Sequence, residues 1–515
     1  MKEQAVNNKT SRREFIAMTA AVAAAGCGNV EKPEVAPMTT SLTDLTAADA
    51  LAAIRNGNVT AEAYATALIA RCRETENLNA WRVFEPERIL EAARAADSHR
   101  ASGGSLGPLH GLPIPVKDSV NTSEYPTSGG TRALENFRPA EDSELVKRLI
   151  AAGAIVMGKT NIHEMSFGWT SNNYAFGAVR NPYHPERIPG GSSGGTGAAI
   201  AARMAPIGIA EDTQGSIRVP AALCGVYGYR PTQNRYPNQG VMPITPIFDQ
   251  VGPHARSVAD IALFDAVVTG EPNAIEDIED PLAAVHGARF GISREFYFDS
   301  LHPDVERITN QAIQKLADAG AVMVEVDVPN VGEFVAEITD PVQVYDVLPS
   351  FSRYLEEFGA GITFDELVAE VSDDIAATFA EYVVAGAPRR PSDEEFARLR
   401  DERLPAFRLA MAEYFSTNNL DGMIFPCTQM AATPIGQDNE VELNGKMVPF
   451  AGVMGRNISP CSTTGIPGLV IPAGLDSDGL PVSVELNGPA GSDVKMLQLG
   501  SGIEQILGHL PPPSV

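Results

Sequence analysis

The chain has 515 residues, of which 44% are hydrophobic and 20% are charged, a composition typical of a large soluble globular enzyme. Its formal net charge of −26 at pH 7 gives a surface that repels nucleic acid and anionic lipid, so neither is expected as a partner. No apolar stretch of membrane-spanning length follows the N-terminal region, and no internal repeat or low-complexity segment occurs.

Residues 1–26 are typical of an export signal. Arg12 and Arg13 precede a weakly hydrophobic run that is too short to span a membrane, and this order favours the twin-arginine route. The run ends in two alanines, a glycine and Cys27, which predicts cleavage before Cys27 and a lipid anchor on its thiol; an ordinary cleavage site is the alternative. Residues 27–40 are expected to form a tether. We therefore expect an exported protein, either periplasmic or a lipoprotein of the cell envelope.

Helical periodicity dominates residues 42–101, with Ser41 and Thr60 placed as N-caps. These helices are expected to pack outside the sheet that carries the site. The next predicted elements are a helix over 143–152 and a buried strand over 154–157.

Residues 153–160 satisfy the spacing of a phosphate-binding loop, GxxxxGK[ST]. A phosphate loop needs flexible backbone between a strand and a helix, whereas the four middle residues here are apolar and are themselves the predicted strand. We therefore reject nucleotide binding for this segment.

Three motifs combine glycine with serine or lysine. Residues 107–118 form a mostly apolar run that ends in Lys117 and Asp118, and a desolvated lysine can lose its proton near neutral pH. Residues 189–197 and 211–220 each set serine among glycines, the first with Ser192 and Ser193 and the second with Ser216. Glycine permits close backbone approach, so several N–H groups can converge on one anion beside a serine hydroxyl.

The serine pair also matches the nucleophile elbow GxSxG, which would make Ser193 the nucleophile. That elbow needs a strand directly before it, and residues 181–189 contain three prolines. The helical run 198–204 that follows places the glycine–serine loop at a helix N-terminus. We therefore reject the elbow interpretation.

Further along the chain, residues 205–210 predict a strand and 212–216 the turn that leaves it. A strand over 288–292, a helix over 302–319 and a strand over 321–328 follow, and residues 331–418 are mostly helical. The acidic and arginine-rich stretch 392–403 is interpreted as a solvated helix face.

Together the three motifs resemble the amidase signature family, whose hydrolases use a serine–serine–lysine triad. They occur in the family's order, with positions 117, 192 and 216 separated by 75 and 24 residues. The resemblance covers residues 41–508, is loose over a variable substrate region at about 280–420, and leaves 509–515 as a tail. It implies an α/β fold: one large domain with a mixed twisted β-sheet covered by helices on both faces.

The resemblance also implies roles for these residues. Ser216 is the nucleophile, and Ser192, in a cis peptide bond, relays its proton to neutral Lys117. The oxyanion hole is formed by the backbone N–H groups of Thr213, Gln214, Gly215 and Ser216. The chain departs from the family at Gln214, which stands where glycine is usual. Three apolar residues are expected either to border the acyl pocket or to belong to the core: Met165, Phe167 and Trp169.

The implied activity is that of an amidase, which hydrolyses a small or aryl carboxylic amide to a carboxylate and an amine or ammonia through a seryl acyl-enzyme. One alternative is an ester or carbamate hydrolase of the same family. A second is a protein like the amidase-type component of a tRNA-dependent amidotransferase, against which the export signal argues. A third is a catalytically dead surface-binding lipoprotein, against which the intact lysine and serines argue. The oligomeric state, monomer or homodimer, is open.

No metal or other cofactor is expected. None of the eight histidines stands in a metal-ligand spacing, and the five cysteines form no CxxC pair. Apart from Cys27, the cysteines at 72, 224, 427 and 461 are therefore interpreted as buried thiols.

Overall fold

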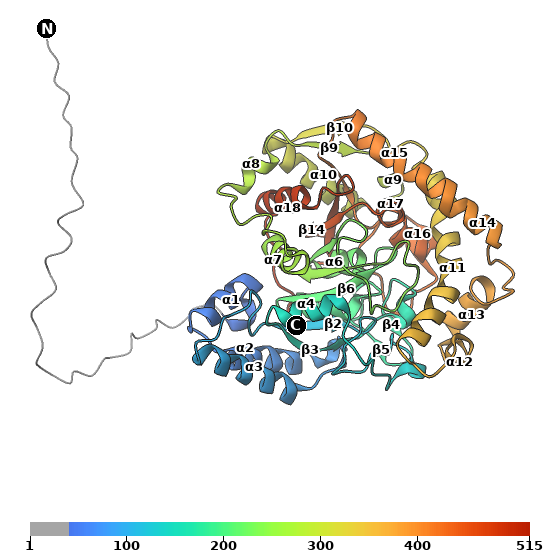
Figure 1. The fold of residues 1–515 in the computed structure, drawn as a ribbon. Coiled ribbons are helices and arrows are strands. Elements are labelled where there is room, and N and C mark those ends of the chain that lie inside the picture. The colour runs from blue at the N-terminus through green and yellow to red at the C-terminus, as the bar shows by residue number, and fades with distance from the viewer. Residues whose placement is uncertain (1–40) are drawn as a thin grey trace, which may run out of the picture. The chain divides into compact units, whose positions relative to one another are not determined.

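The fold is organised around one mixed sheet of 11 strands, seen in the computed structural model, which describes residues 41–515 (Figure 1). The predicted export signal, tether and lipidated Cys27 lie outside the described residues. In spatial order the strands are β1 (Trp81–Val83), β3 (Ile155–Thr160), β2 (Pro113–Lys117), β6 (Ile207–Asp212), β8 (Gln250–Ala255), β7 (Tyr227–Arg230), β14 (Gly468–Leu475), β15 (Pro481–Asn487), β11 (Gly422–Pro426), β9 (Arg289–Ile292) and β10 (Val322–Glu325).

The strands that carry the motifs are neighbours in this sheet. β2 runs parallel to β3 and to β6, and β6 pairs antiparallel with β8 from Ile207 opposite Ala255 to Asp212 opposite Gln250. Every residue of β2, β6 and β8 is buried, because helices cover this part of the sheet. The carboxyl ends of β2 and β6 therefore reach the same edge of the sheet.

Helices surround the sheet (Figure 1), and the α/β class with a single large domain is confirmed. Apart from residues 331–418, the helices are α1 (Ala47–Arg55), α2 (Ala61–Glu74), α3 (Pro86–Ala101), α4 (Glu144–Ala151), α5 (Gly194–Ala201), α6 (Arg218–Cys224), α7 (Val258–Thr269), α8 (Pro281–Val285), α9 (Arg294–Tyr297), α10 (Pro303–Asp318), α16 (Phe450–Gly455), α17 (Ser459–Thr464) and α18 (Asp493–Leu507). Within residues 41–515 no helix is long and apolar enough to cross a membrane.

The N-terminal prediction is correct for the helices but misses a strand. The Thr60 hydroxyl accepts the N–H of Ala63 and caps α2, as predicted. Ser41 precedes a short 3₁₀ helix (Leu42–Asp44) and makes no side-chain capping bond. β1, which lies in the segment predicted to be helical, is only three residues long and pairs with β3, so no local periodicity marks it.

The phosphate-loop interpretation is excluded by the structure. β3 extends through Thr160, beyond the predicted end at residue 157, so the Gly-Lys-Thr segment is itself part of a strand. Lys159 is fully buried, and its Nζ donates to the carbonyl oxygen of Val120 and to Thr127 Oγ1. The ammonium is held inside the protein and faces no phosphate site.

The region predicted to be helical is coloured yellow to orange in Figure 1. Its helices are α11 (Val331–Glu357), α12 (Phe364–Val368), α13 (Asp373–Tyr382), α14 (Asp393–Arg398) and α15 (Leu404–Thr417). Phe351, Phe364 and Phe379 are buried in the apolar cluster of α11, α12 and α13, whereas α14 and α15 pack into a second cluster. The charged face of α14 is solvated as predicted, while Phe396 on its other face is buried.

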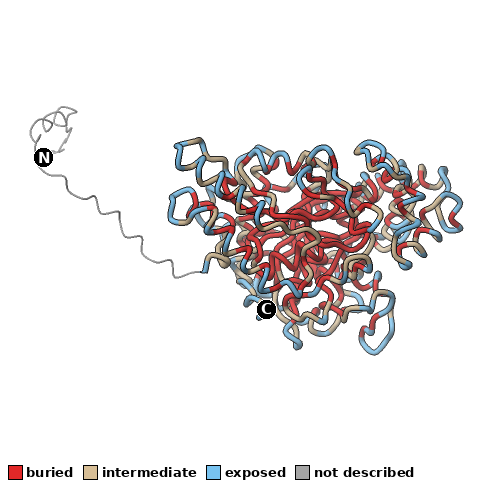
Figure 2. The backbone as a smooth tube through the Cα atoms, turned by 90° about the horizontal axis from the view of Figure 1, so that it is seen from below, coloured by how far each residue is buried: buried red, intermediate tan, exposed pale blue. Residues whose placement is uncertain are grey.

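Two hairpins outside the main sheet have no counterpart in the sequence prediction: β4 (Asn172–Asn173) with β5 (Gly177–Ala178), and β12 (Glu440–Leu443) with β13 (Lys446–Pro449). Buried residues fill the interior of the molecule, and exposed residues lie mainly at its periphery (Figure 2). The four cysteines after Cys27 are free and buried, which confirms the interpretation as thiols.

Candidate active site

The three sequence motifs meet at the shared edge of β2 and β6. Lys117 is the last residue of β2, Ser192 lies in the loop that enters α5, and Ser216 lies in the turn between β6 and α6. α5 packs against both strands, which brings the glycine–serine loop to their carboxyl ends. The fold therefore unites residues separated by as many as 99 positions, from 117 to 216.

Lys117 and Ser192 form a buried hydrogen-bonded pair. Lys117 Nζ lies 2.6 Å from Ser192 Oγ, and both side chains are fully buried. The Gly191–Ser192 peptide bond is cis, as the resemblance implied. A serine hydroxyl in this position can exchange protons with the amine of Lys117.

Lys117 also contacts a carboxylate that the sequence analysis did not single out. Glu211 Oε2 lies 2.7 Å from Lys117 Nζ, and the Ser119 and Ser166 hydroxyls donate to the same oxygen at 3.3 and 3.2 Å. Burial lowers the pKa of Lys117, while the charge of Glu211 and its hydrogen bond act in the opposite direction. Because β6 ends at Asp212, two residues beyond the predicted end at residue 210, Glu211 belongs to the strand and faces Lys117 on β2.

Ser216 is placed to react with a ligand in a neighbouring pocket. Its side chain lines that pocket, and its Oγ makes no hydrogen bond to any residue within 41–515. Ser192 and Ser216 do not bond to each other directly; instead the N–H of Ser193 donates to the Ser216 carbonyl oxygen at 3.4 Å, which ties the two segments together. Ser216 thus has a free hydroxyl next to the Lys117–Ser192 pair.

The predicted oxyanion hole needs one correction. The N–H of Gly215 donates to Asp212 Oδ1 at 2.8 Å, so this group is not available to a substrate. Glycine is nevertheless required there: its φ is +90°, and a Cβ would lie 1.8 Å from Ile458 Cδ1. The N–H groups of Thr213, Gln214 and Ser216 have no partner among residues 41–515, and they remain the candidate donors.

Ser193, the second serine of the pair, has a side chain that makes a structural hydrogen bond. Ser193 Oγ donates to the carbonyl oxygen of Glu211 at 3.1 Å and is fully buried. Residues 181–189 contain no strand, so the strand-to-helix geometry of a nucleophile elbow is absent at Ser193.

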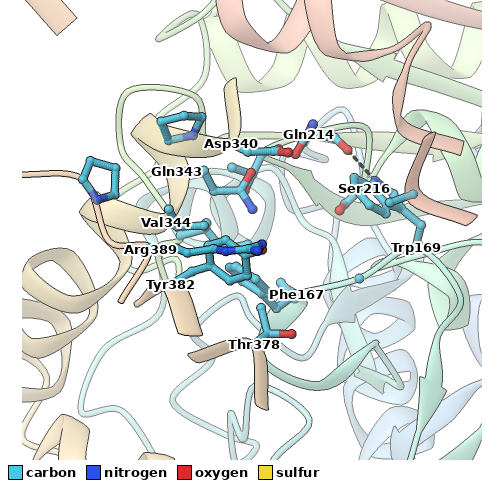
Figure 3. A pocket seen from close by; sticks show the side chains of 17 residues that line it. Phe167, Trp169, Gln214, Ser216, Asp340, Gln343, Val344, Thr378, Tyr382 and Arg389 are labelled. Carbon is cyan, nitrogen blue, oxygen red and sulfur yellow. Dashed lines mark hydrogen bonds between the residues drawn. The ribbon is translucent and has the colours of Figure 1, made fainter. Parts of the chain in front are cut away.

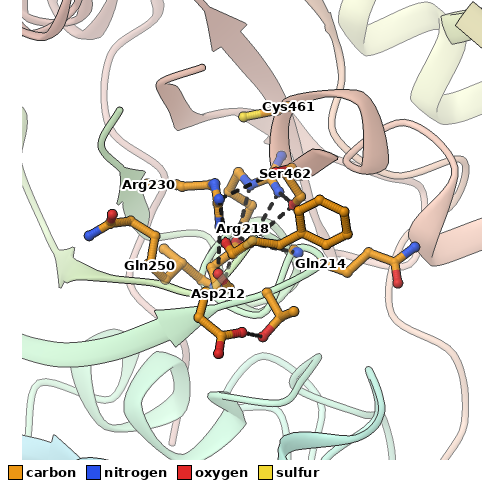
Figure 4. Close-up of polar contacts among 12 residues, drawn as sticks. Asp212, Gln214, Arg218, Arg230, Gln250, Cys461 and Ser462 are labelled. Carbon is orange, nitrogen blue, oxygen red and sulfur yellow. Dashed lines mark hydrogen bonds and ion pairs between the residues drawn. The ribbon is translucent and has the colours of Figure 1, made fainter. Parts of the chain in front are cut away.

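A buried ion network holds the turn that carries Ser216 (Figure 4). Asp212 accepts from the N–H of Ile217 and from Arg218 and Arg230, and Arg218 Nη1 also lies 2.7 Å from Glu485 Oε1. Although burial alone raises the pKa of Asp212, the two guanidinium groups outweigh it and hold that pKa well below its usual range. The network fixes both ends of the turn and thereby positions Ser216.

The pocket beside Ser216 has a volume of about 470 Å³ (Figure 3). Phe167 and Trp169 line it, as the sequence analysis allowed, whereas Met165 is buried in the apolar cluster and does not line it. Other lining residues come from the substrate region, where sequence patterns revealed only helices: Asp340, Gln343, Val344, Thr378, Tyr382 and Arg389.

Gln214 links the turn to this pocket. Its carbonyl oxygen accepts from Trp169 Nε1 at 2.6 Å, and its side-chain Nε2 donates to Ser459 Oγ at 2.9 Å. Its Oε1 is buried and has no partner among residues 41–515. Figure 3 shows Asp340 of α11 next to this side chain, so two hydrogen-bond acceptors lie together at the pocket.

A buried lysine–serine pair beside a pocket that presents a second serine is the arrangement of a hydrolase that works by acyl transfer to serine. Comparison with known proteins agrees with this class. The family model "Amidase" matches residues 63–497. An indoleacetamide hydrolase of Rhizobium radiobacter is 37% identical over 441 residues, covering 86% of this chain and 92% of that protein.

A mandelamide hydrolase of Pseudomonas putida is 33% identical, over 92% of this chain and 93% of its own length. The crystal structure of the peptide amidase PAM in complex with chymostatin superposes with a TM-score of 0.78 at 28% identity, covering 92% of this chain and 99% of that one. The chain belongs to the amidase family, and its activity is the hydrolysis of amide C–N bonds.

Proposed function

We propose that the protein hydrolyses a small carboxamide whose acyl group carries an aromatic ring. The observation that carries this proposal is the pocket beside Ser216, which is lined by Phe167, Trp169 and Tyr382. Aromatic walls favour a planar apolar group. The names of the indoleacetamide and mandelamide hydrolases, both relatives of this chain, point to the same class of substrate.

In the proposed mechanism Ser216 Oγ attacks the amide carbonyl carbon. Its proton passes to Ser192, whose own proton passes to Lys117 over the 2.6 Å hydrogen bond. The oxyanion accepts hydrogen bonds from backbone N–H groups of the turn that begins at Thr213. When the C–N bond breaks, the relay returns a proton to the leaving nitrogen, and water then hydrolyses the acyl-enzyme by the same route.

The acceptors at the pocket make the proposal more specific. Gln214 Oε1, which has no partner among residues 41–515, and Asp340 can both accept a hydrogen bond; burial raises the pKa of Asp340, and its hydrogen bond with the Gln214 side chain acts in the opposite direction. An acyl group with an N–H or O–H donor would bond to these oxygens, whereas a plain hydrocarbon ring would leave Gln214 Oε1 unpaired. We therefore expect a preference for substrates that combine an aromatic ring with such a donor.

A panel of purified substrates tests this proposal. Mandelamide and phenylacetamide differ by one hydroxyl, and a hydrogen bond to a charged acceptor contributes about 1.5–3 kcal/mol, so kcat/KM should favour mandelamide by at least about tenfold. Replacing Asp340 by Leu should remove most of that ratio and leave the rate with phenylacetamide within a few-fold. Equal rates with both amides in the parent enzyme would contradict the preference, and hydrolysis of esters or carbamates alone would contradict the substrate class.

We further propose that the protein is exported, as a periplasmic enzyme or a lipoprotein anchored at Cys27. The paired Arg12 and Arg13 before a weakly hydrophobic run support this proposal, as does the position of Cys27 directly after a run of small residues. Fractionation of cells into cytoplasm, periplasm and membranes, with the enzyme's activity measured in each fraction, tests this proposal.

A further inference from the structure

Glu211 stands at the centre of a buried chain of polar groups. Its Oε2 contacts Lys117 Nζ at 2.7 Å, and the exposed fractions of the two side chains are 1% and 0%. Its other oxygen, Oε1, lies 3.0 Å from Thr213 Oγ1, which in turn lies 2.6 Å from Asp249 Oδ1. Hydrogen bonds shielded from water in this way are strong and polarise one another.

The number of protons in this chain can be counted. The Thr213 hydroxyl has one proton but contacts a carboxyl oxygen on each side, so both contacts are full hydrogen bonds only when one of the two carboxyl groups itself carries a proton. Glu211 faces the ammonium group of Lys117 and two serine hydroxyls, the surroundings of an ionised carboxylate. Asp249 accepts the N–H groups of Ile244 and Thr245 but forms no ion pair among residues 41–515, and burial and the charge of Glu211 outweigh those hydrogen bonds and raise its pKa well above the usual range. The protonated group is therefore Asp249.

The other charges around this chain are already balanced or absent. The surrounding groups are the ion pairs of Asp212 with Arg218 and Arg230, the ion pair of Asp118 with Lys159, and the buried histidines His163 and His254. Burial lowers the pKa of both histidines, to about 4 for His254, so both are neutral. No further cation among residues 41–515 pairs with Glu211, so Lys117 is its proton partner.

We propose that Lys117 and Glu211 act together as the base, with Glu211 holding the proton of Lys117 while Lys117 receives the next one from Ser192. This inference rests on the proposed mechanism and deepens it. Before attack, one proton moves from Nζ to Glu211 Oε2, giving a neutral amine and a neutral acid. The pair therefore accepts a second proton without first losing one to solvent.

The remaining steps balance. As the Ser216 Oγ–carbon bond forms and the carbonyl π bond becomes an oxyanion, the Ser216 proton moves to Ser192, and the Ser192 proton moves to Lys117. The pair then holds two protons. When the C–N bond breaks, Lys117 returns one proton through Ser192 to the leaving nitrogen, and Glu211 returns the other to Lys117, which restores the starting state.

This role of Glu211 determines the direction in which its removal shifts the acid limb of the pH–rate profile. If the active pair already holds one proton, activity falls only when acid adds a second, so the acid limb of the rate profile lies in the range of carboxyl titration. Without Glu211 the active form is the free amine of Lys117, and the limb must lie at the titration of a lysine. If Glu211 merely stabilised the ammonium, its removal would instead move the limb to lower pH.

The test follows the rate at which a fluorophosphonate labels Ser216 as a function of pH. This reaction needs the base but no amide substrate, and fluoride leaves without a proton, so the result stands even if the proposed substrate class is wrong. Glu211→Gln should move the acid limb to higher pH by at least one unit. A limb that stays in place or moves to lower pH overturns the proposal.

Two further measurements keep the test decisive. Asp249→Asn, which replaces one neutral group by another, should leave the limb within a few tenths of a unit of the parent; an alkaline shift as large as that of Glu211→Gln would overturn the assignment to Glu211. If Glu211→Gln does not fold, Glu211→Ala is measured in the same way: an acid limb at higher pH by at least one unit supports the shared base, and a limb that stays in place or moves to lower pH overturns it.

Discussion

The adjacent serines Ser192 and Ser193 provide a matched pair of alanine substitutions. Both side chains are fully buried: Ser192 Oγ contacts Lys117 Nζ at 2.6 Å, and Ser193 Oγ donates to the Glu211 carbonyl oxygen at 3.1 Å and accepts from the Glu211 N–H at 3.4 Å. Ser192→Ala breaks the proton relay, and general acid–base catalysis contributes about 10²–10⁴-fold, or about 3–5 kcal/mol of transition-state stabilisation. Ser193→Ala removes a structural hydrogen bond, which costs about 0.5–1.5 kcal/mol of stability and little of kcat.

The assay compares kcat/KM for an amide and for the matching p-nitrophenyl ester. An amine needs a proton to leave and p-nitrophenolate does not, so Ser192→Ala should lose more activity on the amide than on the ester. Circular dichroism and thermal unfolding verify that both variants fold. Two results would refute the relay. One is a loss of kcat/KM in Ser193→Ala that equals or exceeds the loss in Ser192→Ala. The other is a loss in Ser192→Ala that is the same for the amide and the ester.

Three other predictions address stability and export. Asp249 is protonated in the folded state at a pH at which an unfolded aspartate, with a pKa of about 3.9, is ionised, so the parent loses stability as pH rises. Asp249→Asn should therefore gain Tm relative to the parent as pH rises above about 4, and a difference that does not change with pH contradicts this. Arg218→Ala leaves the buried Glu485 without its ion-pair partner and removes one of the two guanidinium partners of Asp212, so it should cost about 3–5 kcal/mol in urea unfolding; a loss below about 1 kcal/mol would show that the network is dispensable. Changing Arg12 and Arg13 to Lys should leave active, unprocessed enzyme in the cytoplasm, and Cys27→Ala should prevent labelling by a lipid precursor; normal export of the double-lysine variant would contradict the signal.

The sequence contained most of the catalytic framework because glycine and serine motifs are local. The motifs around Lys117, Ser192 and Ser216 identified the family, and the resemblance supplied the sheet architecture and the cis bond. The physical objections to the phosphate loop and the nucleophile elbow also agree with the structure, since the first is a strand and the second has no strand before it.

What the sequence could not reveal depends on contacts between distant elements. Glu211 follows a predicted strand and precedes a familiar motif, and only the pairing of β2 with β6 brings it within 2.7 Å of Lys117. The hydrogen bond from the Gly215 N–H to the Asp212 carboxylate forms only in the folded turn. Asp340 lies within a long helix, and only the packing of that helix brings it to Gln214 and the pocket. Three-residue β1 is formed by pairing with β3 and leaves no periodic pattern.

The most direct test of the mechanism is to identify the residue that becomes acylated. A fluorophosphonate should add once to the protein, peptide mapping by mass spectrometry should place the adduct on Ser216, and an aryl acetamide should protect it. Ser216→Ala should lose both the adduct and amide hydrolysis. An adduct on Ser193, or amide hydrolysis by the Ser216→Ala enzyme, would contradict the assignment of Ser216 as the nucleophile.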